Sequence, residues 1–220
     1  MTRPTALALA LAAVAVVRLP AQGATADKGV TVAQIASKKY QALGSFQAAF
    51  RQVRDDKYNG VEESRGMLYQ EGKSHLALRW SDPPKEAIVL DGTYFWLYTP
   101  STSPGQVLQY RQQNHPTYGG DLIGMFLDNP EGRYRISYVT SEVIDGHTTD
   151  AVIMEPIAKD PNFLRATLWL DRQSGLPRRI EIQEKRDYKR TLYLTSLLQN
   201  PSIPPATFKF DPKGLKIIPQ

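Results

Sequence analysis

The sequence predicts a single α+β domain, an antiparallel barrel or sandwich of about eleven strands with two helices. Two observations support this prediction. Segments with an apolar residue at every second position follow one another along most of the chain, and turn-forming pairs such as Asp91-Gly92 and Ser174-Gly175 separate them. Only two segments show helical spacing, which argues against alternating strand–helix units.

The N-terminus is predicted to be a secretory signal peptide, residues 1–26, preceding a domain of residues 27–220. Arg3 gives it a positive start, and the apolar run at residues 5–17 is too short to span a membrane. Ala24-Thr25-Ala26 matches the small-residue cleavage motif. The alternative is a membrane anchor that is never cleaved. With cleavage, we expect an exported, soluble protein.

The first helix is predicted to begin at Thr31, because Thr31 and Gln34 fit a capping box, and to run to about Gly44. The second is short and spans residues 121–127. The apolar positions that indicate these helices are Val32, Ile35, Ala36 and Leu43 in the first, and Leu122, Met125 and Phe126 in the second.

The strands are predicted from alternation with period two. In residues 75–80, for example, Leu76, Leu78 and Trp80 share one face, while His75 and Arg79 lie on the other. The predicted strands cover residues 46–54, 64–69, 75–80, 87–90, 94–98, 106–111, 134–139, 149–155, 165–171, 178–185 and 190–196.

Composition and motifs exclude most chemistry. The chain has no Cys, so disulfides, thiol nucleophiles and Cys-based zinc sites are excluded. Three His residues stand apart, and neither a serine-hydrolase elbow nor a phosphate-binding loop is present. Without Arg3 and Arg18 the chain has 25 basic and 22 acidic residues, scattered rather than clustered. We therefore expect no enzyme activity, no cofactor, no metal and no nucleic-acid partner.

Two interpretations account for the apolar faces. Either one sheet curls round the first helix and buries everything, or a curved sheet encloses an apolar cavity with the helices as a lid. Periodicity alone favours the buried core. The inward-facing candidates are Leu76, Leu78, Trp80, Ile88, Leu90, Trp96, Ile136, Met154, Leu168, Leu170, Ile180, Ile182, Leu192 and Leu194.

Five short motifs, in this order, resemble the LolA family of lipoprotein carriers. The first is F-x-A-x-F-x-Q at residues 46–52, directly after the first predicted helix. The others are Gly66-x-Leu68, Trp80 with Pro83, the D-G-x-x-x-W-x-Y-x-P run at residues 91–100, and Phe208-x-Phe210-x-Pro212-x-Gly214. Each is weak alone, but together they span almost the whole chain from Thr31 to Gly214.

The resemblance implies an incomplete, strongly curved antiparallel barrel with helices closing over a hydrophobic cavity. It also implies a monomeric periplasmic chaperone that takes up lipoprotein acyl chains from an inner-membrane ABC-type release complex. The carrier then passes them to an outer-membrane receptor resembling LolB. Because LolB is itself lipidated on a Cys, this chain resembles the soluble carrier instead.

The resemblance, together with the strand pattern, also implies site residues. The expected cavity wall consists of Phe46, Phe50, Leu76, Leu78, Trp80, Ile88, Leu90 and Trp96. The expected lid consists of Ile35, Leu43, Leu122, Met125 and Phe126. The family usually carries an Arg after the G-x-L strand that ties the lid to the barrel; here Glu71-Gly72-Lys73 stands there, and Lys73 is the remaining donor. The C-terminal motif of this chain, at residues 208–214, is also one residue shorter than is usual in the family.

Two other functions remain open. One is a LolA-like carrier or sensor of another lipid or amphiphile, which lipoprotein release from membranes would distinguish from the first. The other is an enzyme on a β-rich scaffold, which would need a catalytic pair converging at the cavity mouth.

Overall fold

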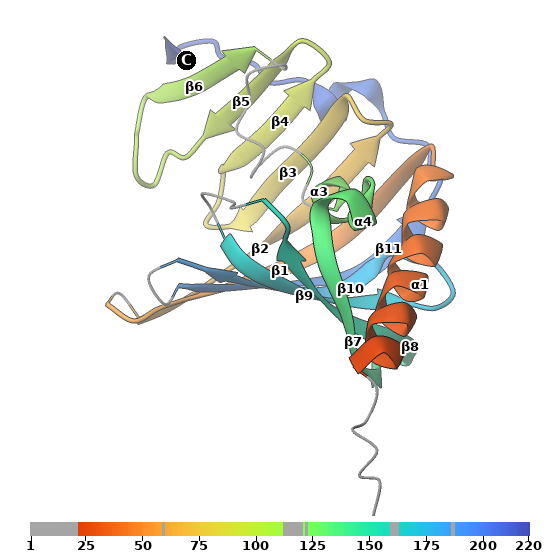
Figure 1. The fold of residues 1–220 in the computed structure, drawn as a ribbon. Helices are drawn as coiled ribbons and strands as arrows, with labels where there is room; N and C mark the ends of the chain where they lie inside the picture. The colour runs from red at the N-terminus through yellow and green to blue at the C-terminus, as the bar shows by residue number, and fades with distance from the viewer. Residues whose placement is uncertain (1–21, 59, 112–120, 122, 159–162, 186–187) are drawn as a thin grey trace, which may run out of the picture.

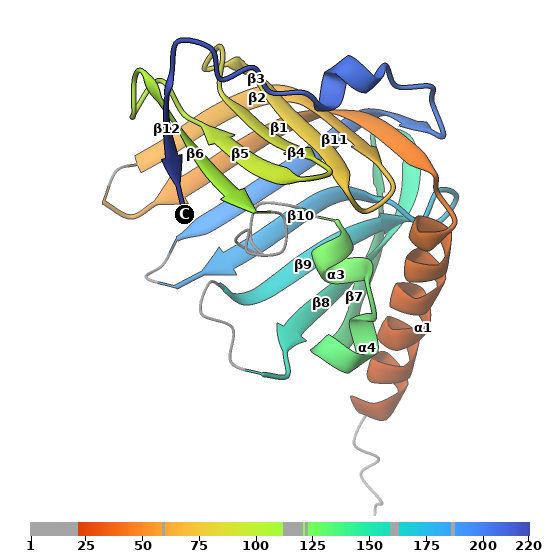
Figure 2. The ribbon, with the colours of Figure 1, turned by 90° about the horizontal axis from the view of Figure 1, so that it is seen from above.

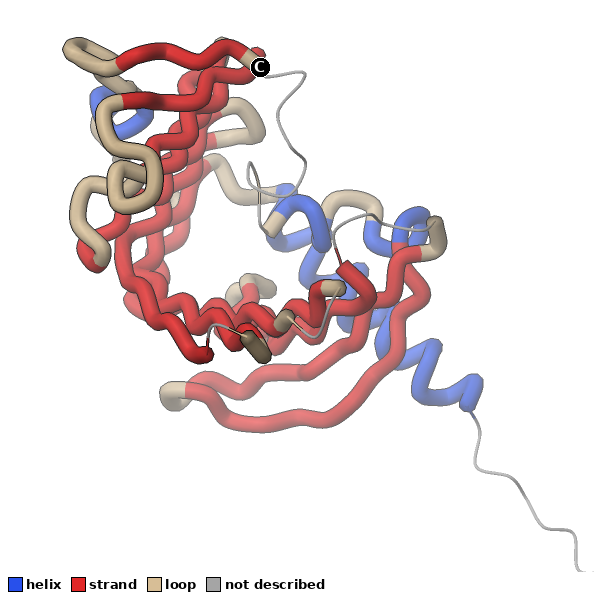
Figure 3. The backbone as a smooth tube through the Cα atoms, turned by 90° about the vertical axis from the view of Figure 1, so that its left-hand side faces the viewer, coloured by secondary structure: helices blue, strands red, loops and turns tan. Residues whose placement is uncertain are grey.

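One twelve-stranded sheet curves into an incomplete barrel, and helices pack against its concave side (Figures 1 and 3). The computed structural model describes residues 22–58, 60–111, 121, 123–158, 163–185 and 188–220. None of the helices within these ranges is long and apolar enough to cross a membrane. The predicted fold class, an α+β domain with an unclosed antiparallel barrel, is confirmed.

The strands alternate with tight turns along the chain, as the sequence predicts. They are β1 (Ser45–Asp56), β2 (Gly60–Glu71), β3 (His75–Asp82), β4 (Ala87–Asp91), β5 (Tyr94–Tyr98), β6 (Gln106–Arg111), β7 (Tyr134–Ile144), β8 (His147–Pro156), β9 (Phe163–Asp171), β10 (Pro177–Glu184), β11 (Lys189–Gln199) and β12 (Lys216–Pro219). The helices are α1 (Gln22–Gln41), α3 (Gly124–Leu127), α4 (Pro130–Arg133) and the 3-10 turn η2 (Pro205–Phe208).

Most strands pair with their neighbours in sequence. The order across the sheet is β12-β6-β5-β4-β3-β2-β1-β11-β10-β9-β8-β7. The pairing of β1 with β11 therefore joins the half formed by β1–β6 and β12 to the half formed by β7–β11. All pairs are antiparallel except β12 with β6, which are parallel. The two edge strands, β12 and β7, are not paired with each other, and this keeps the barrel open.

The two faces of the sheet carry separate apolar clusters. The concave cluster joins the inward side chains of β1–β11 to Ala33, Ala36 and Tyr40 of α1 and to α3. The convex cluster lies over β3–β6, where the C-terminal segment crosses the sheet before it forms β12 (Figure 2). The convex face over β3–β6 is thus covered by the chain's own C-terminal segment.

One motif glycine has a clear structural reason. Gly66 on β2 faces the ring of Phe50 on β1, and a Cβ atom there would lie 2.2 Å from the carbonyl oxygen of Arg79 and 2.7 Å from Cζ of Phe50. No side chain fits between these groups without displacing the backbone of β3. The G-x-L motif therefore serves the packing of the sheet.

The strand predictions agree well with the structure, and the helix predictions agree less well. Eleven strands were expected and each is present, while β12 and the turn η2 were missed. The first helix begins at Gln22 rather than at Thr31. Thr31 lies inside the helix, and its hydroxyl donates a hydrogen bond to the carbonyl oxygen of Asp27 at 2.9 Å. A Thr that bonds its own helix in this way does not cap it.

The second helix is shorter than predicted and is followed by another. α3 covers only the end of the predicted segment, and Asp121 caps it by accepting a hydrogen bond from the backbone N–H of Gly124 at 2.7 Å. A few residues later a further short helix, α4, which was not among the predicted elements, precedes β7. Pro130 begins α4, the position where proline costs a helix least.

Candidate functional site

A pocket of about 1140 Å³ lies at one end of the concave face. Its volume is slightly above the range of small-molecule sites, about 300–1,000 Å³. Trp80, Ile88 and Leu97, from β3, β4 and β5, make an apolar wall. Gln52, Ser64 and several charged residues of β1, β2, β10 and β11 make a polar wall.

The predicted wall residues divide into two groups. Trp80 and Ile88 line the pocket directly and are partly buried. Five others lie deeper, between 2% and 4% exposed, within the concave cluster: Phe46, Phe50, Leu76, Leu78 and Leu90. The rings of Phe50 and Trp80 meet edge to face at 5.3 Å and so connect the buried cluster to the pocket.

Trp96 does not belong with this set. Its ring stacks on Phe210 at 5.4 Å on the convex face, and its indole N–H donates to the carboxylate of Asp91 at 2.8 Å. The hairpin register decides this: Leu90 pairs with Phe95, so Phe95 and Leu97 face inward and Trp96 faces outward. The expectation that Trp96 lines the cavity is therefore wrong.

The same contacts explain two of the family motifs. Phe210 lies against Trp96 and Tyr98, and Phe208 lies 5.5 Å from His75. Arg79 donates from one guanidinium nitrogen to two carbonyl oxygens of this C-terminal segment, at 2.8 and 2.9 Å. The motifs around residues 91–100 and 208–214 hold the C-terminal segment on the outside of the sheet.

The predicted lid residues are placed less uniformly. Met125 and Phe126 are buried in the concave cluster, at 6% and 0% exposed, and Leu43 is partly buried against it. Ile35 is 51% exposed and does not contribute to the buried face of α1. Leu122 lies outside the described residues.

A polar cluster joins the helices to the end of β2. The Tyr40 hydroxyl donates to the Asp121 carboxylate at 2.8 Å and accepts from the amide of Gln70, also at 2.8 Å. Burial, and then the charge of Asp121, raise the pKa of Tyr40, so its hydroxyl stays a donor. The cluster thus links α1, the cap of α3 and β2 through hydrogen bonds.

Lys73 makes a second tie across the same boundary. Its ammonium group lies 3.1 Å from both carboxylate oxygens of Asp128, the residue that ends α3. The side chain of Lys73 is 71% exposed, and its ammonium group is the single donor of this pair. We expect such an exposed pair to contribute only about 0–1 kcal/mol.

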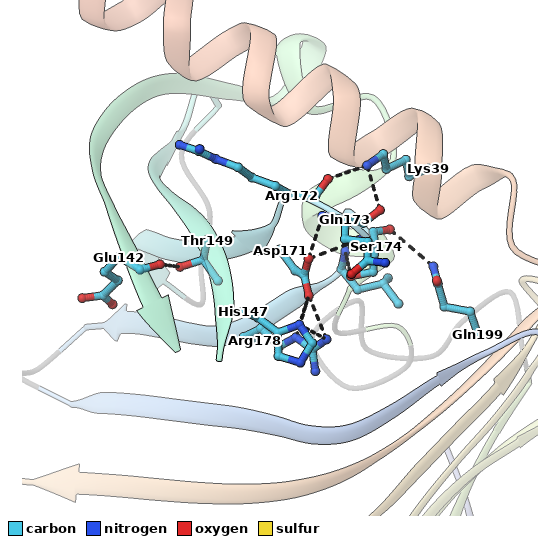
Figure 4. A network of polar contacts seen from close by, with 11 residues as sticks. Lys39, Glu142, His147, Thr149, Asp171, Arg172, Gln173, Ser174, Arg178 and Gln199 are labelled. Atoms are coloured by element: carbon cyan, nitrogen blue, oxygen red, sulfur yellow. Dashed lines mark hydrogen bonds and ion pairs between the residues drawn. The ribbon is translucent and has the colours of Figure 1, made fainter. Parts of the chain in front are cut away.

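The other side of α1 is held more firmly, by the turn between β9 and β10. Lys39 donates to the carbonyl oxygens of Arg172 and Gln173 at 2.6 and 2.8 Å (Figure 4). Near the start of α1, a Cβ on Gly29 would lie 2.6 Å from the backbone nitrogen of Tyr138, which shows how closely the helix lies on β7. α1 is therefore part of the β7–β10 side of the molecule.

Buried charges shape that turn. Asp171 accepts two hydrogen bonds from Arg178, at 2.7 and 2.9 Å, and His147 lies 3.0 Å away (Figure 4). Its other oxygen accepts the backbone N–H groups of Gln173 and Ser174. Burial alone raises the pKa of Asp171, but these hydrogen bonds outweigh it and hold the pKa below its usual value.

Sequence reasoning missed the polar wall of the pocket. Gln52 and Arg54 continue the inward alternation that starts at Phe46, so both face the concave side. Polar and charged residues at positions that should be apolar are the signal that could have identified them. Among the described residues, no three His, Asp or Glu side chains gather as a metal site would require.

Comparisons with known proteins agree with this architecture. The family model described as "Outer membrane lipoprotein carrier protein LolA" matches residues 41–211. An outer-membrane lipoprotein carrier protein of Legionella pneumophila (strain Lens) is 25% identical over 191 residues, 86% of this chain and 91% of that protein.

Two solved structures share the fold. An uncharacterised conserved protein from Thermus thermophilus has a TM-score of 0.59 at 11% identity, covering 88% of this chain and 99% of that one. The Pseudomonas aeruginosa MucA/MucB complex contains a chain with a TM-score of 0.51 at 12% identity, covering 84% of this chain and 61% of that one. At such low identity the likeness concerns the fold alone.

Proposed function

Because the chain belongs to the outer membrane lipoprotein carrier family LolA, we propose that it binds lipoprotein acyl chains in the concave pocket. It accepts them from an inner-membrane ABC-type release complex and hands them to an outer-membrane receptor resembling LolB, as a monomer in the periplasm. No covalent step is needed, so the role is that of a chaperone rather than an enzyme. The signal-peptide pattern at residues 1–26 supports export.

The energetics of the cargo support a carrier. Each buried methylene is worth about 0.8 kcal/mol, so one chain of about fifteen methylenes costs on the order of 12 kcal/mol to expose to water. A lipoprotein with several chains does not cross an aqueous compartment unprotected. A carrier must also release its cargo, which favours an adaptable apolar surface over a tightly fitted one.

One observation carries the proposal: the concave face offers a pocket of about 1140 Å³ beside the wall of Trp80, Ile88 and Leu97. This wall continues inward into the cluster that contains Phe50 and Leu78. Met125 and Phe126 of α3 cover that cluster, as a lid would. If the lid moves away from the β2 side, the apolar surface available to acyl chains grows from the pocket into the cluster.

The polar ties at the end of β2 fit an opening step. Lys73 with Asp128, and Gln70 with Tyr40 and Asp121, join the helices to the β2–β3 corner by a few polar groups. Such contacts exchange readily with water once they are exposed, whereas the apolar contacts of α1 with β7 do not. We therefore place the opening between α3 and the β2–β3 corner, with α1 staying on β7–β10.

The test is release of lipoproteins from membranes. Purified protein is incubated with spheroplasts whose lipoproteins carry labelled acyl chains, and soluble one-to-one complexes are measured. We expect release by the wild type and loss of release by Trp80→Glu, since a charge on the pocket wall is poorly solvated when lipid enters. Gln183→Glu, on the strand next to the pocket but not lining it, serves as the control.

The other outcomes are also informative. Wild-type protein that is folded but releases no lipoprotein, beside a working family carrier, contradicts the lipoprotein assignment. Lipid extracted from the purified protein would then identify another amphiphile as cargo. Full release by Trp80→Glu would exclude the pocket as the binding site.

A further inference from the structure

We propose that Arg54 and Arg190 bind the carbonyl oxygens of the ligand's head group, an acyl ester or amide, while its chain lies on the wall of Trp80, Ile88 and Leu97. This inference rests on the proposed function, because it assumes that the pocket takes an acylated ligand. It adds the orientation of that ligand and the chemistry of its polar end.

Polarity changes in one direction along three adjacent strands. On β1 the inward residues run from Phe50 to Gln52 to Arg54, ending at the pocket's outer end. On β11 the side chain of Leu192 is buried, and Arg190, two residues before it, lines the pocket. On β2 the side chain of Leu68 is buried, whereas Ser64 and Glu62 line the pocket. An amphiphile matches this gradient with its chain inward and its head at the charged end.

The two guanidinium groups stand on directly opposed residues. Arg54 of β1 pairs with Arg190 of β11 in the strand register, and both line the pocket. Each has its own carboxylate on the outer side: Arg54 lies 2.5 Å from Glu62, and Arg190 lies 2.5 and 3.0 Å from Glu184. Glu62 is the register partner of Arg54 on β2. Glu184 instead lies on β10 two residues beyond Ile182, the register partner of Arg190. Each carboxylate is thus on the strand that flanks the Arg pair.

Like charges on opposed residues of a sheet are unfavourable, so this arrangement costs stability. Their carboxylates offset the cost but lie to either side rather than between them. A ligand with acceptor oxygens placed between the two Arg side chains would accept further hydrogen bonds from them, since each guanidinium has five N–H donors. Hydrogen bonds to charged groups are among the stronger ones in proteins.

The remaining charges of the pocket favour a neutral acceptor over a phosphate. Carboxylates outnumber cations among the lining residues. The acidic ones are Asp56, Glu62, Glu63, Asp82, Glu86 and Glu184, and the basic ones are Arg54, Lys185 and Arg190. Ester and amide carbonyls accept hydrogen bonds without adding negative charge, whereas an anionic phospholipid head would meet this excess of carboxylates. The pocket therefore suits the ester- and amide-linked chains of a lipid-modified protein better than an anionic phospholipid.

A matched pair of ligands tests the carbonyl directly. 1-Monomyristoylglycerol and 1-O-tetradecylglycerol share the glycerol head and a chain of fourteen carbons, but only the first has an ester carbonyl. We expect the wild type to bind the ester about tenfold more tightly, measured by calorimetry below the aggregation limit of both ligands. Lyso-phosphatidylglycerol of the same chain length adds a phosphate to the head group. It should bind more weakly than 1-monomyristoylglycerol.

The chain offers a matched control variant. Arg54→Met keeps an unbranched apolar stem in place of the Arg side chain but removes its donors, and should abolish the preference for the ester over the ether. The control is Arg51→Met. Arg51 also lies on β1 and pairs with a Glu, Glu63 at 3.3 Å, but Arg51 does not line the pocket. The Arg51→Met variant should therefore keep the preference for the ester. Arg190→Met is made together with Glu184→Gln, so that the negative charge of the partly buried Glu184 is removed together with its partner cation.

The results separate this inference from the proposed function. Equal affinity for ester and ether in the wild type, or a preference that survives in Arg54→Met or in the Arg190 double variant, overturns the role of the two Arg residues. Tighter binding of lyso-phosphatidylglycerol than of 1-monomyristoylglycerol also overturns the proposed role. If none of the three ligands binds to the folded wild type, the proposed function itself fails.

Discussion

At the scale of single residues, side chains of the same type serve opposite faces of the sheet. Trp80 and Trp96 both occur in family motifs and both lie in strands, yet one lines the pocket and the other holds the C-terminal segment. Arg51 and Arg54 likewise belong to one strand but face opposite sides of the sheet. Side-chain parity in a strand thus separates structural from ligand-facing residues that have the same chemistry.

The contrast between the tryptophans gives a prediction. Trp96→Ala removes the stacking partner of Phe210 from the convex cluster and should lower the free energy of unfolding by about 3 kcal/mol. Affinity for a bound amphiphile should stay within about twofold, because the ring does not face the pocket. Urea unfolding and calorimetry measure the two effects. A folded Trp96→Ala protein with abolished affinity would place Trp96 in the binding site after all.

At the scale of elements, the β9–β10 turn is the support of α1. Asp171 and Arg178 shape the turn, and the turn presents its carbonyl oxygens to Lys39. Both members of the ion pair are buried, at 3% and 8% exposed, so removing one leaves the other with little solvent. The position of the helix on the β7–β10 side therefore depends on a charge pair that does not line the pocket.

This pair predicts a pH dependence. The pKa of Asp171 is lowered in the folded protein, so its contribution to stability is present above the unfolded value of about 3.9. It is lost as the pH falls through the lower folded pKa. Asp171→Asn should cost about 3 kcal/mol at pH 7, and its difference from the wild type should shrink below about pH 4.

Urea unfolding of both proteins from pH 7 down to pH 3 measures this difference. Asp145→Asn, in an exposed turn, is the control and should follow the wild type at every pH. A difference between Asp171→Asn and the wild type that stays constant with pH would show that the carboxylate charge contributes nothing.

At the scale of the whole molecule, the sheet separates two tasks. Its convex side over β3–β6 is occupied by the chain's own C-terminus, and its concave side carries the pocket and the helices. The helices join the β7–β10 side through apolar packing and Lys39, but join the β2–β3 corner largely through polar groups. The weaker boundary is where we expect the barrel to open.

The Lys73 tie gives a prediction for that boundary. Lys73→Met removes an exposed ion pair worth about 0–1 kcal/mol, so the open form should gain up to about fivefold in population. Amide hydrogen exchange in residues 124–128 should speed up by the same factor, and the rate of amphiphile uptake should rise with it. Lys213→Met, at an exposed turn, is the control. Faster exchange in both variants would point to a general loss of stability instead.

What the sequence by itself determined is the local part of this protein: eleven strands, their turns, the alternation of faces within each strand and the family. These features depend on neighbours in the chain, where period and turn chemistry act directly. The tertiary structure alone decided the outward face of Trp96, the partner of Lys73, the start of α1, the parallel strand β12 and the meeting of Arg54 with Arg190. The run from Tyr94 to Tyr98 is apolar at every position, so only its register with β4 assigns the faces. The other features join segments far apart in sequence, whose encounter depends on the closure of the whole sheet.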